Sequence, residues 1–485
     1  MTLTSAINSA KNVFSNTGEQ SAVISKNIAN SSDPNYVKRT TVSYGTLSGS
    51  TQVSTERATN GLLQSQMFMA QSESSGQQTL VDGLEQLKSV LGGNEYELSP
   101  STYLSKFYDS LQNFATKPGE VAMAQTAISA AGDVVNSLNT ATKAVQDLRE
   151  QADQDISDSV TDLNALLSQL ETLNNKVISI TTVGGDPSDA LDLRDGVISD
   201  ISQIVGINVQ TRDKGDVVLY TTDGTTLFET IPRTVTFTPQ TFYDAGVSGN
   251  PVMVDGTRVN IGVGGDTSAQ GSIAAQLQIR DEIAPVFQSQ LDEVARGLIT
   301  IFSETDPSLV NPDEPGLFTW SGGTSLTAGT IEPGLAGTIA VSTAVQSSAG
   351  GDPMLLRDGG INGAAYIHNT GGAAGYTDQL NDFLDGMTGD MIFDAAAQID
   401  DNTSLMSFST SSVGWLEEYR SGASNGAETK TAMLLRAEEA YSNKTGVSLD
   451  EELSLLLDVE QSYKAATKLL NAVDEMLQSL LAVAG

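Results

Sequence analysis

Hydrophobic residues recur at alternating steps of three and four along the last forty residues of the chain. This spacing places them on one narrow stripe of a helix. Ser448 is a suitable helix cap, Glu451 follows three residues later, and neither Gly nor Pro interrupts the pattern before Gly485. The pattern predicts one helix of about 36 residues, roughly 54 Å long at 1.5 Å per residue. Its stripe consists of Leu456, Val459, Tyr463, Ala466, Leu470, Val473, Leu477, Leu480 and Ala484.

Residues 3–28 repeat this spacing in a weaker form, because Thr17 and Ser21 occupy two of the apolar positions. Residues 1–45 carry four basic and two acidic side chains, whereas residues 446–485 carry two basic and seven acidic ones. Opposite net charge favours pairing of the two ends, although surface charge adds little energy. A long final helix packed only on its own domain is the alternative. We infer that the ends form one coiled-coil unit that leaves apolar surface for neighbouring subunits.

Amphipathic helical patterns fill much of the sequence between these ends. One runs from Asn60 to a stop at Gly92, and another from Ser99 to Phe114. Two further helices are expected, with apolar faces at residues 124–148 and 156–180. The pattern returns in later segments, including one that Pro285 should kink or restart. These later segments are residues 272–303, a stretch from about residue 378, and residues 403–443.

Short alternating runs separated by turn residues, including Asp223-Gly224, predict a small sheet or barrel after residue 205. We therefore predict a mainly α protein with β insertions, in which terminal helices form a coiled coil around a nested helical bundle that carries small inserted β domains. The expected boundaries are residues 1–59 with 446–485 for the terminal domain, 60–204 with 271–304 and 376–445 for the bundle, 205–270 for the β domain, and 305–375 for an irregular or β insertion.

Composition excludes several classes of function. The chain has 25 basic and 60 acidic residues, a net charge of −35, which disfavours binding to nucleic acids and to anionic membranes. It has no cysteine, so disulfides, thiolate nucleophiles and cysteine metal sites are absent. No apolar run approaches the length of a membrane span, and the N-terminus lacks the features of a cleaved signal peptide.

Candidate chemistry is sparse. His368 is the only histidine, and no pattern supplies it with an orienting acid or a nucleophile, so we expect a loop residue. Asp186, Asp189, Asp192 and Asp195 stand three apart, which differs from the alternating carboxylates of calcium loops. We interpret them as acids at the positive end of a helix, with Arg194 near Asp195. We expect no catalytic site, no cofactor and no metal.

Three segments carry a family resemblance. The first is Asn27-Ile28-Ala29-Asn30 followed by Pro34, Tyr36 and Arg39, and it resembles a signature of flagellar rod, hook and hook-associated proteins, with Asp33 and Asn35 where the pattern has Thr and Gly. The run from Asp186 to Val209 is similar to a Leu-Asp-x-Arg-Asp segment of hook-associated proteins. The ending from Thr445 to Leu453 also resembles their tails.

The resemblance implies a non-enzymatic structural protein that joins flagellar hook to filament and leaves the cell by the flagellum's own type III export, without a cleaved signal peptide. It implies four partners: copies of itself, the hook protein, hook-associated protein 3, and a cytoplasmic chaperone on the C-terminal helix. Another axial protein, such as hook-associated protein 3 or a flagellin, a secreted adhesin, and a flagellum-borne hydrolase are the alternatives.

The residues expected at the assembly interface combine the two stripes with the N-terminal motif. They are Leu3, Ile7, Phe14, Ile24, Asn27, Ile28, Asn30, Pro34, Tyr36, Arg39, Leu456, Val459, Tyr463, Leu470, Val473, Leu477 and Leu480.

Overall fold

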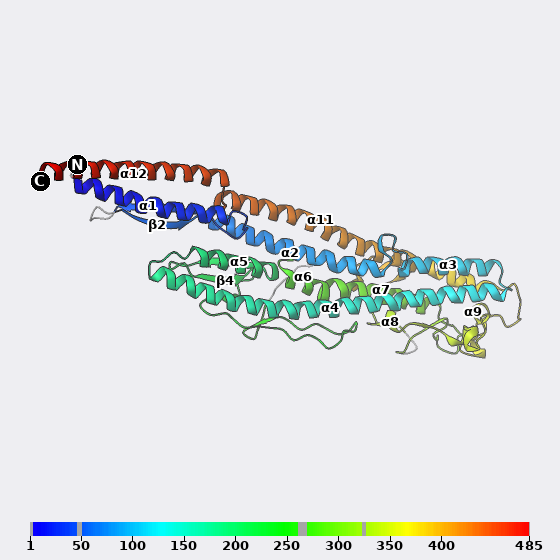
Figure 1. Ribbon diagram of the computed structural model, residues 1–485. Coiled ribbons are helices and arrows are strands. Elements are labelled where there is room, and N and C mark those ends of the chain that lie inside the picture. Colours follow the sequence, from blue (N-terminus) through cyan, green and yellow to red (C-terminus); the bar gives the residue numbers. More distant parts are fainter. Residues whose placement is uncertain (1–2, 46–50, 260–268, 323–325, 485) are drawn as a thin grey trace.

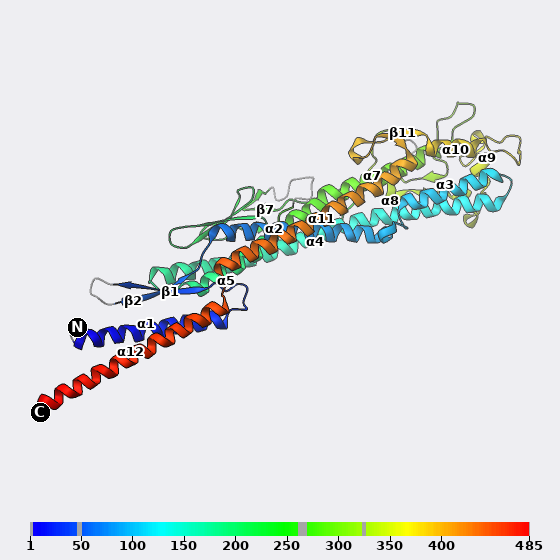
Figure 2. The same ribbon diagram turned by 90° about the horizontal axis from the view of Figure 1, so that it is seen from above.

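The computed structural model describes residues 3–45, 51–259, 269–322 and 326–484. The protein is an elongated assembly of long helices with both chain ends at the same extremity (Figure 1). There α1 (Leu3–Ala29) runs antiparallel to α12 (Leu449–Ala484), and the two helices pack against each other. α12 extends beyond the N-terminus of α1, and both project away from the bundle (Figure 2). We call α1 and α12 the terminal pair.

The bundle is built from helices that lie far apart in the sequence. α2 and α11 pack along each other, and the hairpin of α3 and α4 continues the rod at the end opposite the termini (Figure 1). The bundle helices are α2 (Gly61–Val90), α3 (Pro100–Thr116), α4 (Val121–Thr182), α5 (Ser188–Ile204), α6 (Ser272–Gln278), α7 (Ala284–Ile301), α10 (Asp378–Thr388) and α11 (Leu405–Thr445).

One helix, α4, replaces the two that the apolar faces at 124–148 and 156–180 predicted. The intervening residues contain no Gly or Pro, and their polar side chains are used inside the fold instead of in a turn. Arg149 donates to the carbonyl oxygens of Arg280 and Asp244, and Asp153 pairs with Arg280 at 2.6 Å. The prediction of a break was therefore wrong, because buried tertiary partners satisfy these charges along an uninterrupted helix.

The expected β region forms two small antiparallel sheets beside α4, with strand orders β3-β4-β5 and β6-β7-β8. Two further sheets hold pairs of short strands, β9 with β10 and β11 with β12, and β1 pairs with β2 near the terminal pair. The strands are β1 (Arg39–Gly45), β2 (Thr51–Arg57), β3 (Ile207–Thr211), β4 (Val217–Thr221), β5 (Thr226–Phe228), β6 (Val235–Thr236), β7 (Met253–Val254), β8 (Thr257–Arg258), β9 (Phe318–Thr319), β10 (Ala340–Val341), β11 (Asp390–Ile392) and β12 (Asn402–Ser404).

Pro285 acts as expected on its helix. A π-helical turn, Ile279–Ile283, separates α6 from α7, and Pro285 lies in the first turn of α7. Proline lacks the N–H that an α-helical bond would need, so the preceding turn widens while the chain keeps its direction.

A cluster of phenylalanines closes the core at the far end. Phe302 lies 5.3 Å from both Phe107 and Phe318, and 4.5 Å from Phe383, between ring centroids. These rings come from α3, the C-cap of α7, β9 and α10, so the cluster joins the bundle to the segment after residue 304. The described part of residues 305–375 is largely irregular, with β9, β10 and two short helices, α8 (Leu335–Thr338) and α9 (Leu355–Asp358).

The predicted fold class, mainly α with small β insertions and paired terminal helices, is confirmed. Among the described residues, no helix combines the length and the apolar character needed to cross a bilayer. The division into four domains with the boundaries given above stays a proposal.

Candidate assembly site

The site is the terminal pair together with its connection to the bundle, which we call the joint. At its centre Asn27, near the end of α1, is buried and makes three hydrogen bonds through its side-chain amide. Its Nδ2 donates to the carbonyl oxygen of Arg39 at 2.9 Å, and its Oδ1 accepts from the Tyr36 hydroxyl at 2.9 Å and from the Arg39 N–H at 3.2 Å. One asparagine therefore folds the loop of residues 30–38 back onto α1.

Three acids on α5 receive the basic side chains of the joint. Because Asp189, Asp192 and Asp195 stand three apart, they lie along one face of the helix. Arg39 contacts Asp189 at 2.6 Å and Asp192 at 2.8 Å, and Arg57 contacts Asp192 and Asp195, both at 2.7 Å. This acidic row on α5 thus holds both strands at the open end of the β1–β2 hairpin, since Arg39 begins β1, Arg57 ends β2 and the two residues pair across the sheet.

The electrostatics of the joint favour an ionised Asp189 and a neutral Tyr36. Burial acts against the charge of Asp189, but hydrogen bonds from Lys26 and Arg39 outweigh it and lower the pKa of this carboxyl. Burial also raises the pKa of Tyr36 to about 12, so its hydroxyl stays protonated and donates to Asn27. The Arg39 guanidinium lies 4.7 Å from the centre of the Tyr36 ring, a cation–π contact that adds to the packing.

A second set of contacts ties α12 to the joint. The Lys38 N–H donates to the carbonyl oxygen of Thr445 at 2.7 Å, where α11 ends. The Lys38 ammonium contacts Glu451 at 2.7 Å and Glu452 at 3.6 Å, in the first turn of α12. Glu452 is 1% exposed, and neither of its carboxylate oxygens makes a hydrogen bond to the described residues.

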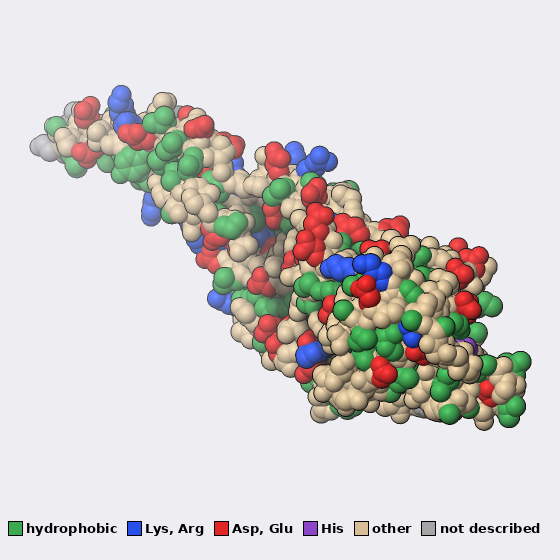
Figure 3. Space-filling model, turned by 90° about the vertical axis from the view of Figure 1, so that its right-hand side faces the viewer, with side chains coloured by type: hydrophobic (Ala, Val, Ile, Leu, Met, Phe, Trp, Pro, Cys, Tyr) green, Lys and Arg blue, Asp and Glu red, His purple; other side chains and the backbone are tan. Residues whose placement is uncertain are grey.

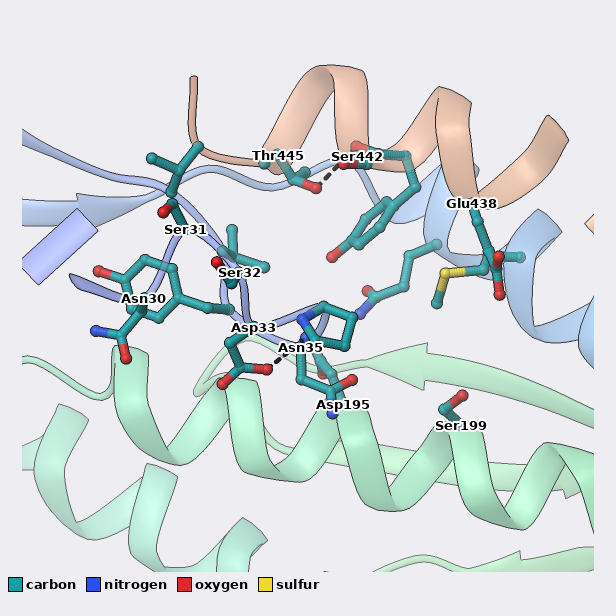
Figure 4. Close-up of a pocket in the computed structure, with 18 of the residues that line it drawn as sticks. Asn30, Ser31, Ser32, Asp33, Asn35, Asp195, Ser199, Glu438, Ser442 and Thr445 are labelled. Atoms are coloured by element: carbon teal, nitrogen blue, oxygen red, sulfur yellow. Dashed lines mark hydrogen bonds between the residues drawn. The ribbon is translucent and has the colours of Figure 1, made fainter. Parts of the chain in front are cut away.

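A cleft of about 350 Å³ opens at the joint between the loop, α5 and the end of α11 (Figure 4). Asn30, Asp33 and Asn35 lie on one side of it, with Asp195 of α5 beneath and Thr445 of α11 above. Its lining mixes acids, Arg57, amides and hydroxyls with apolar groups that include Val37, Met67 and Val447. Such a mixed surface is typical of a junction between packed elements.

The terminal pair buries little of its own apolar surface. Along α12 the buried positions between Leu449 and Ser479 are Glu452, Ala466 and Val473. They are separated by 14 and 7 residues, so they lie in one column along the helix. α1 covers this one column, with Phe14 against Tyr463 at 4.9 Å between ring centroids. Tyr463 nevertheless stays 53% exposed.

Two rows of larger apolar residues flank this buried column at heptad spacing. They were only partly visible in the sequence, where Ser462 interrupts the second row. All their members described here are exposed or half-buried. The first row is Leu449, Leu456, Tyr463, Leu470 and Leu477, and the second is Leu455, Leu469 and Met476.

The structure distributes the predicted interface residues over the joint and the terminal pair. Asn27, Asn30, Pro34, Tyr36 and Arg39 lie in or beside the joint, where Asn27, Tyr36 and Arg39 are buried by contacts within the chain. The stripe residues divide by exposure, and their role between subunits stays a prediction. Ile24 and Val473 are buried, Tyr463 and Leu477 are exposed, and Ile7, Phe14, Ile28, Leu456, Val459 and Leu470 are half-buried. The side chains of Leu3 and Leu480 lie outside the described residues.

Sequence reasoning missed the acidic row on α5 and its basic partners. The acids were interpreted as favourable charges at a helix start, with Arg194 near Asp195. Arg194 interacts electrostatically with Asp195, but it is buried and donates its hydrogen bond to the carbonyl oxygen of Gly215 at 2.5 Å. The threefold spacing of the acids was the available signal, because it predicts one charged helix face that needs basic partners. Among the described residues, no three His, Asp or Glu side chains are grouped as the ligands of a metal ion would be.

Two regions of the chain, one in the helical bundle and one at the C-terminal end, match models of known protein families. Residues 84–307 match the model of the flagellar hook-associated protein FlgK helical domain, and residues 438–483 match the flagellar basal body rod FlgEFG protein C-terminal model. The first match contains α4, the acidic row on α5 and the β3–β8 region. The second contains most of α12 and the end of α11.

Two similar full-length proteins have the same name. Flagellar hook-associated protein 1 of Bacillus subtilis is 23% identical over 441 residues, which cover 85% of this chain and 82% of that protein. The protein of the same name from Salmonella typhimurium is 29% identical over 218 residues, 42% of this chain, and the match spans only 39% of its own length. A solved structure of the flagellar hook junction protein FlgK from Burkholderia pseudomallei overlaps 53% of this chain and 47% of its own, with 21% identity and a TM-score of 0.42.

The matched helical domain, the matched C-terminal region and the shared name of these relatives agree with the resemblance in the N-terminal motif. The chain is therefore similar to flagellar hook-associated protein 1 in its helical domain, in its C-terminal region and, in the relative from Bacillus subtilis, over most of its length.

Proposed function

We propose that the protein is a structural, non-enzymatic subunit of the bacterial flagellum that joins hook to filament outside the cell. Its similarity to flagellar hook-associated protein 1 supports the flagellar setting. The observation that carries the mechanism is the uncovered apolar surface of the terminal pair. A 36-residue helix that buries one narrow column against α1 and leaves apolar rows on both sides is suited to packing against further helices.

In this proposal the exposed rows of α12 meet the terminal pairs of neighbouring subunits. Leu469 and Met476 are 43% and 49% exposed, so each retains apolar area that a neighbour could bury. Burial of such area contributes about 25 cal/mol per Å². Contacts of this kind repeat from subunit to subunit, and a tube of identical chains would form from them.

The joint gives the terminal pair a defined direction relative to the bundle. Buried charge pairs are sensitive to geometry, because each must satisfy its hydrogen bonds to offset its desolvation. Arg39 and Arg57 meet the acidic row on α5 from one side, and Lys38 meets the start of α12 from the other. We infer that this arrangement transmits the packing of the inner tube to the outer bundle.

The partners follow from the same surfaces. We propose contacts with copies of this chain, with the hook protein and with hook-associated protein 3, all through the terminal pair. Before export, a cytoplasmic chaperone would cover the apolar rows of α12, since a bare surface of this kind favours aggregation. Export through the flagellum's own type III apparatus, without a cleaved signal peptide, completes the proposal.

Two variants test the proposed function. Deleting residues 446–485 should leave a folded bundle that cannot join hook to filament in a strain lacking the native chain. A finer variant carries Leu469→Ser with Met476→Ser, which removes exposed apolar area without opening a core. Its matched control is Lys468→Ser with Glu475→Ser, on the same turns of α12.

The measurement is filament number by electron microscopy, with secreted chain quantified in the medium. We expect the Leu469/Met476 variant to be secreted yet to lose most filaments, and the control to keep them. Normal junctions from the deletion variant would refute the proposed function.

A further inference from the structure

A rigid loop at the far end of the molecule presents two large apolar side chains to solvent. Leu309 is 88% exposed and Val310 is 80% exposed, and we call these two residues the apolar tip. Leu309 also has a φ of 56°, in the left-handed region that branched side chains rarely adopt. Exposure and backbone strain at the same residue are both unfavourable for the monomer, which suggests that the conformation serves a contact.

The tip is held by one buried carboxylate. Asp306 accepts from the N–H and hydroxyl of Ser308 at 2.8 and 2.6 Å, and from the N–H of Val310 at 3.2 Å. It also accepts from the N–H and the side-chain amide of Asn311 at 2.9 and 2.8 Å. Five hydrogen bonds to one side chain fix every residue around the tip, so little conformational entropy remains to be lost on binding.

The base of the loop is anchored as well. The backbones of Glu304 and Glu314 pair across it at 2.8 and 3.0 Å. The Tyr366 hydroxyl donates to the carbonyl oxygen of Pro312 at 2.8 Å, and the His368 ring nitrogen Nε2 lies 3.1 Å from the carbonyl oxygen of Thr305. The single histidine is thus a loop residue that supports the tip.

A groove of about 680 Å³ lies on the same part of the molecule, between the first half of α4 and residues 339–353. Buried apolar side chains, including Ile128, Val135 and Ile339, form part of its lining. Gly132 also lines it, and a Cβ added at Gly132 would meet no atom within 4 Å. Glycine inside a helix is less favourable than alanine, and no neighbouring atom of the chain requires it at this position. The missing side chain leaves space in the groove for a side chain from another molecule.

The absence of charged side chains in this groove favours a second copy of the chain as its occupant. Two copies of a chain with net charge −35 repel each other, so a contact between them is favoured where charged groups are absent. The groove lining contains no charged residue, whereas each of four other clefts of the described residues contains at least two. Tip residues 308–311 are also uncharged.

Tip and groove lie at the same level of the rod. The tip loop returns to Leu317, whose N–H donates to the carbonyl oxygen of Phe302, and β9 follows directly. β9 pairs with β10, whose residues Ala340 and Val341 line the groove. Figure 3 shows this end of the molecule, where hydrophobic side chains are scattered among polar and acidic ones.

We propose that the Leu309–Val310 tip of one copy inserts into the groove beside Gly132 of a neighbouring copy. This inference rests on the proposed function, because it requires the subunits to stand side by side. The contact is heterologous, so each subunit contributes a tip to one neighbour and a groove to another. It lies in the outer part of the assembly and is separate from the terminal pair.

Cysteine crosslinking tests the contact directly, since the chain has no cysteine of its own. A Leu309→Cys, Gly132→Cys double variant is made the only copy in the cell, and isolated flagella are treated with a short bis-maleimide. We expect a ladder of dimers, trimers and higher species on a denaturing gel. The matched control replaces Leu309→Cys with Val183→Cys, which is 82% exposed beyond the other end of α4, and should give at least tenfold less crosslinked product.

A second pair of variants covers the case in which the double variant does not assemble. Gly132→Phe should fill the groove without disturbing the fold and should reduce the chain found in flagella at least fivefold. Thr140→Phe, at an exposed position two turns along α4, should not reduce it. Circular dichroism of both purified chains checks that they fold.

The outcomes separate the two proposals. Double-variant chain that is present in flagella without a ladder, or Gly132→Phe that is incorporated like Thr140→Phe, overturns the tip-and-groove contact and leaves the proposed function intact. Crosslinked dimers from Gly132→Cys alone would show groove facing groove and would also overturn it. Absence of the native chain from flagella would instead refute the proposed function, and this inference with it.

Discussion

Asp192 is the residue on which the joint should depend most. Its carboxylate accepts from Arg39 at 2.8 Å and from Arg57 at 2.7 Å, and all three side chains are at most 10% exposed. The variant Asp192→Asn keeps the size of the side chain. Its NH₂ group, however, cannot accept a hydrogen bond from a guanidinium, so one buried arginine loses a partner.

The expected loss follows from the burial of these charges. Removing one partner of a buried ion pair destabilises by about 3–5 kcal/mol. Arg39 keeps Asp189 and Arg57 keeps Asp195, so the lower end of that range applies, about 3 kcal/mol. The loss is local to the joint, because the core of the bundle is untouched.

Backbone hydrogen exchange measures a local loss of this kind. Opening of the joint exposes the N–H groups of residues 38–42 and 53–57, which include β1–β2 ladder positions and the bond from Arg39 to Asn27. Since each 1.4 kcal/mol is a factor of ten, these amides should exchange roughly 100-fold faster in Asp192→Asn. Amides in the middle of α4 should keep their native rates.

Asp200→Asn is the control, an identical substitution at an exposed position of the same helix. We expect it to change exchange in the joint by less than about twofold, as surface substitutions stay within ±0.5 kcal/mol. If Asp192→Asn left exchange at residues 38–42 unchanged as well, the acidic row would not hold the hairpin, and the argument for a fixed joint would be wrong.

Three further predictions concern burial. Burial raises the pKa of Asp292 to about 7, although hydrogen bonds from Ala336 and Gly334 oppose the shift. An unfolded chain releases this proton near pH 4, so the folded state should lose stability as pH rises from about 4 to about 7. Asp292→Asn should flatten this part of a urea-unfolding profile, and an unaltered slope would contradict the assignment. Glu452→Leu replaces a buried carboxylate that makes no hydrogen bonds to the described residues. The stability of the terminal helices, followed by circular dichroism during thermal unfolding, should stay unchanged or rise by about 1 kcal/mol. A clear loss of stability would show that the charge is needed. Phe302→Ala opens the phenylalanine cluster and should lower the free energy of unfolding by about 3–5 kcal/mol. Phe242→Ala, at a 62% exposed ring, should change it by less than about 0.5 kcal/mol.

The helices show which features of the fold the local sequence pattern can predict. The spacing of Leu456, Tyr463 and Leu470 predicted α12 with its full length, because helix periodicity and capping depend on residues within a few positions. The same reasoning divided α4 in two. The polar segment from Arg149 to Asp155 lacks an apolar stripe, and its partners, Arg280 and Asp244, lie about a hundred residues away.

The sequence revealed only some of the residues that form the joint. The motif residues Asn27, Tyr36 and Arg39 and the acids of α5 were each noticed as separate features. That Arg39 meets Asp192 across 153 residues could not be read from either segment, because many acids in a chain of net charge −35 were equally available. Only the path of the chain decides which acid comes within reach.

The amino-acid sequence alone determined the helical periods, the β-like insert, the acidic composition and the amphipathic pattern of both ends, since each is a property of neighbouring residues or of composition. Tertiary structure decided which apolar rows of α12 stay exposed, how Arg39 and Arg57 attach the hairpin to α5, and that Leu309 and Val310 stand in solvent. Exposure and ion pairing depend on which distant segments meet in space, and that is set by the packing of the whole chain.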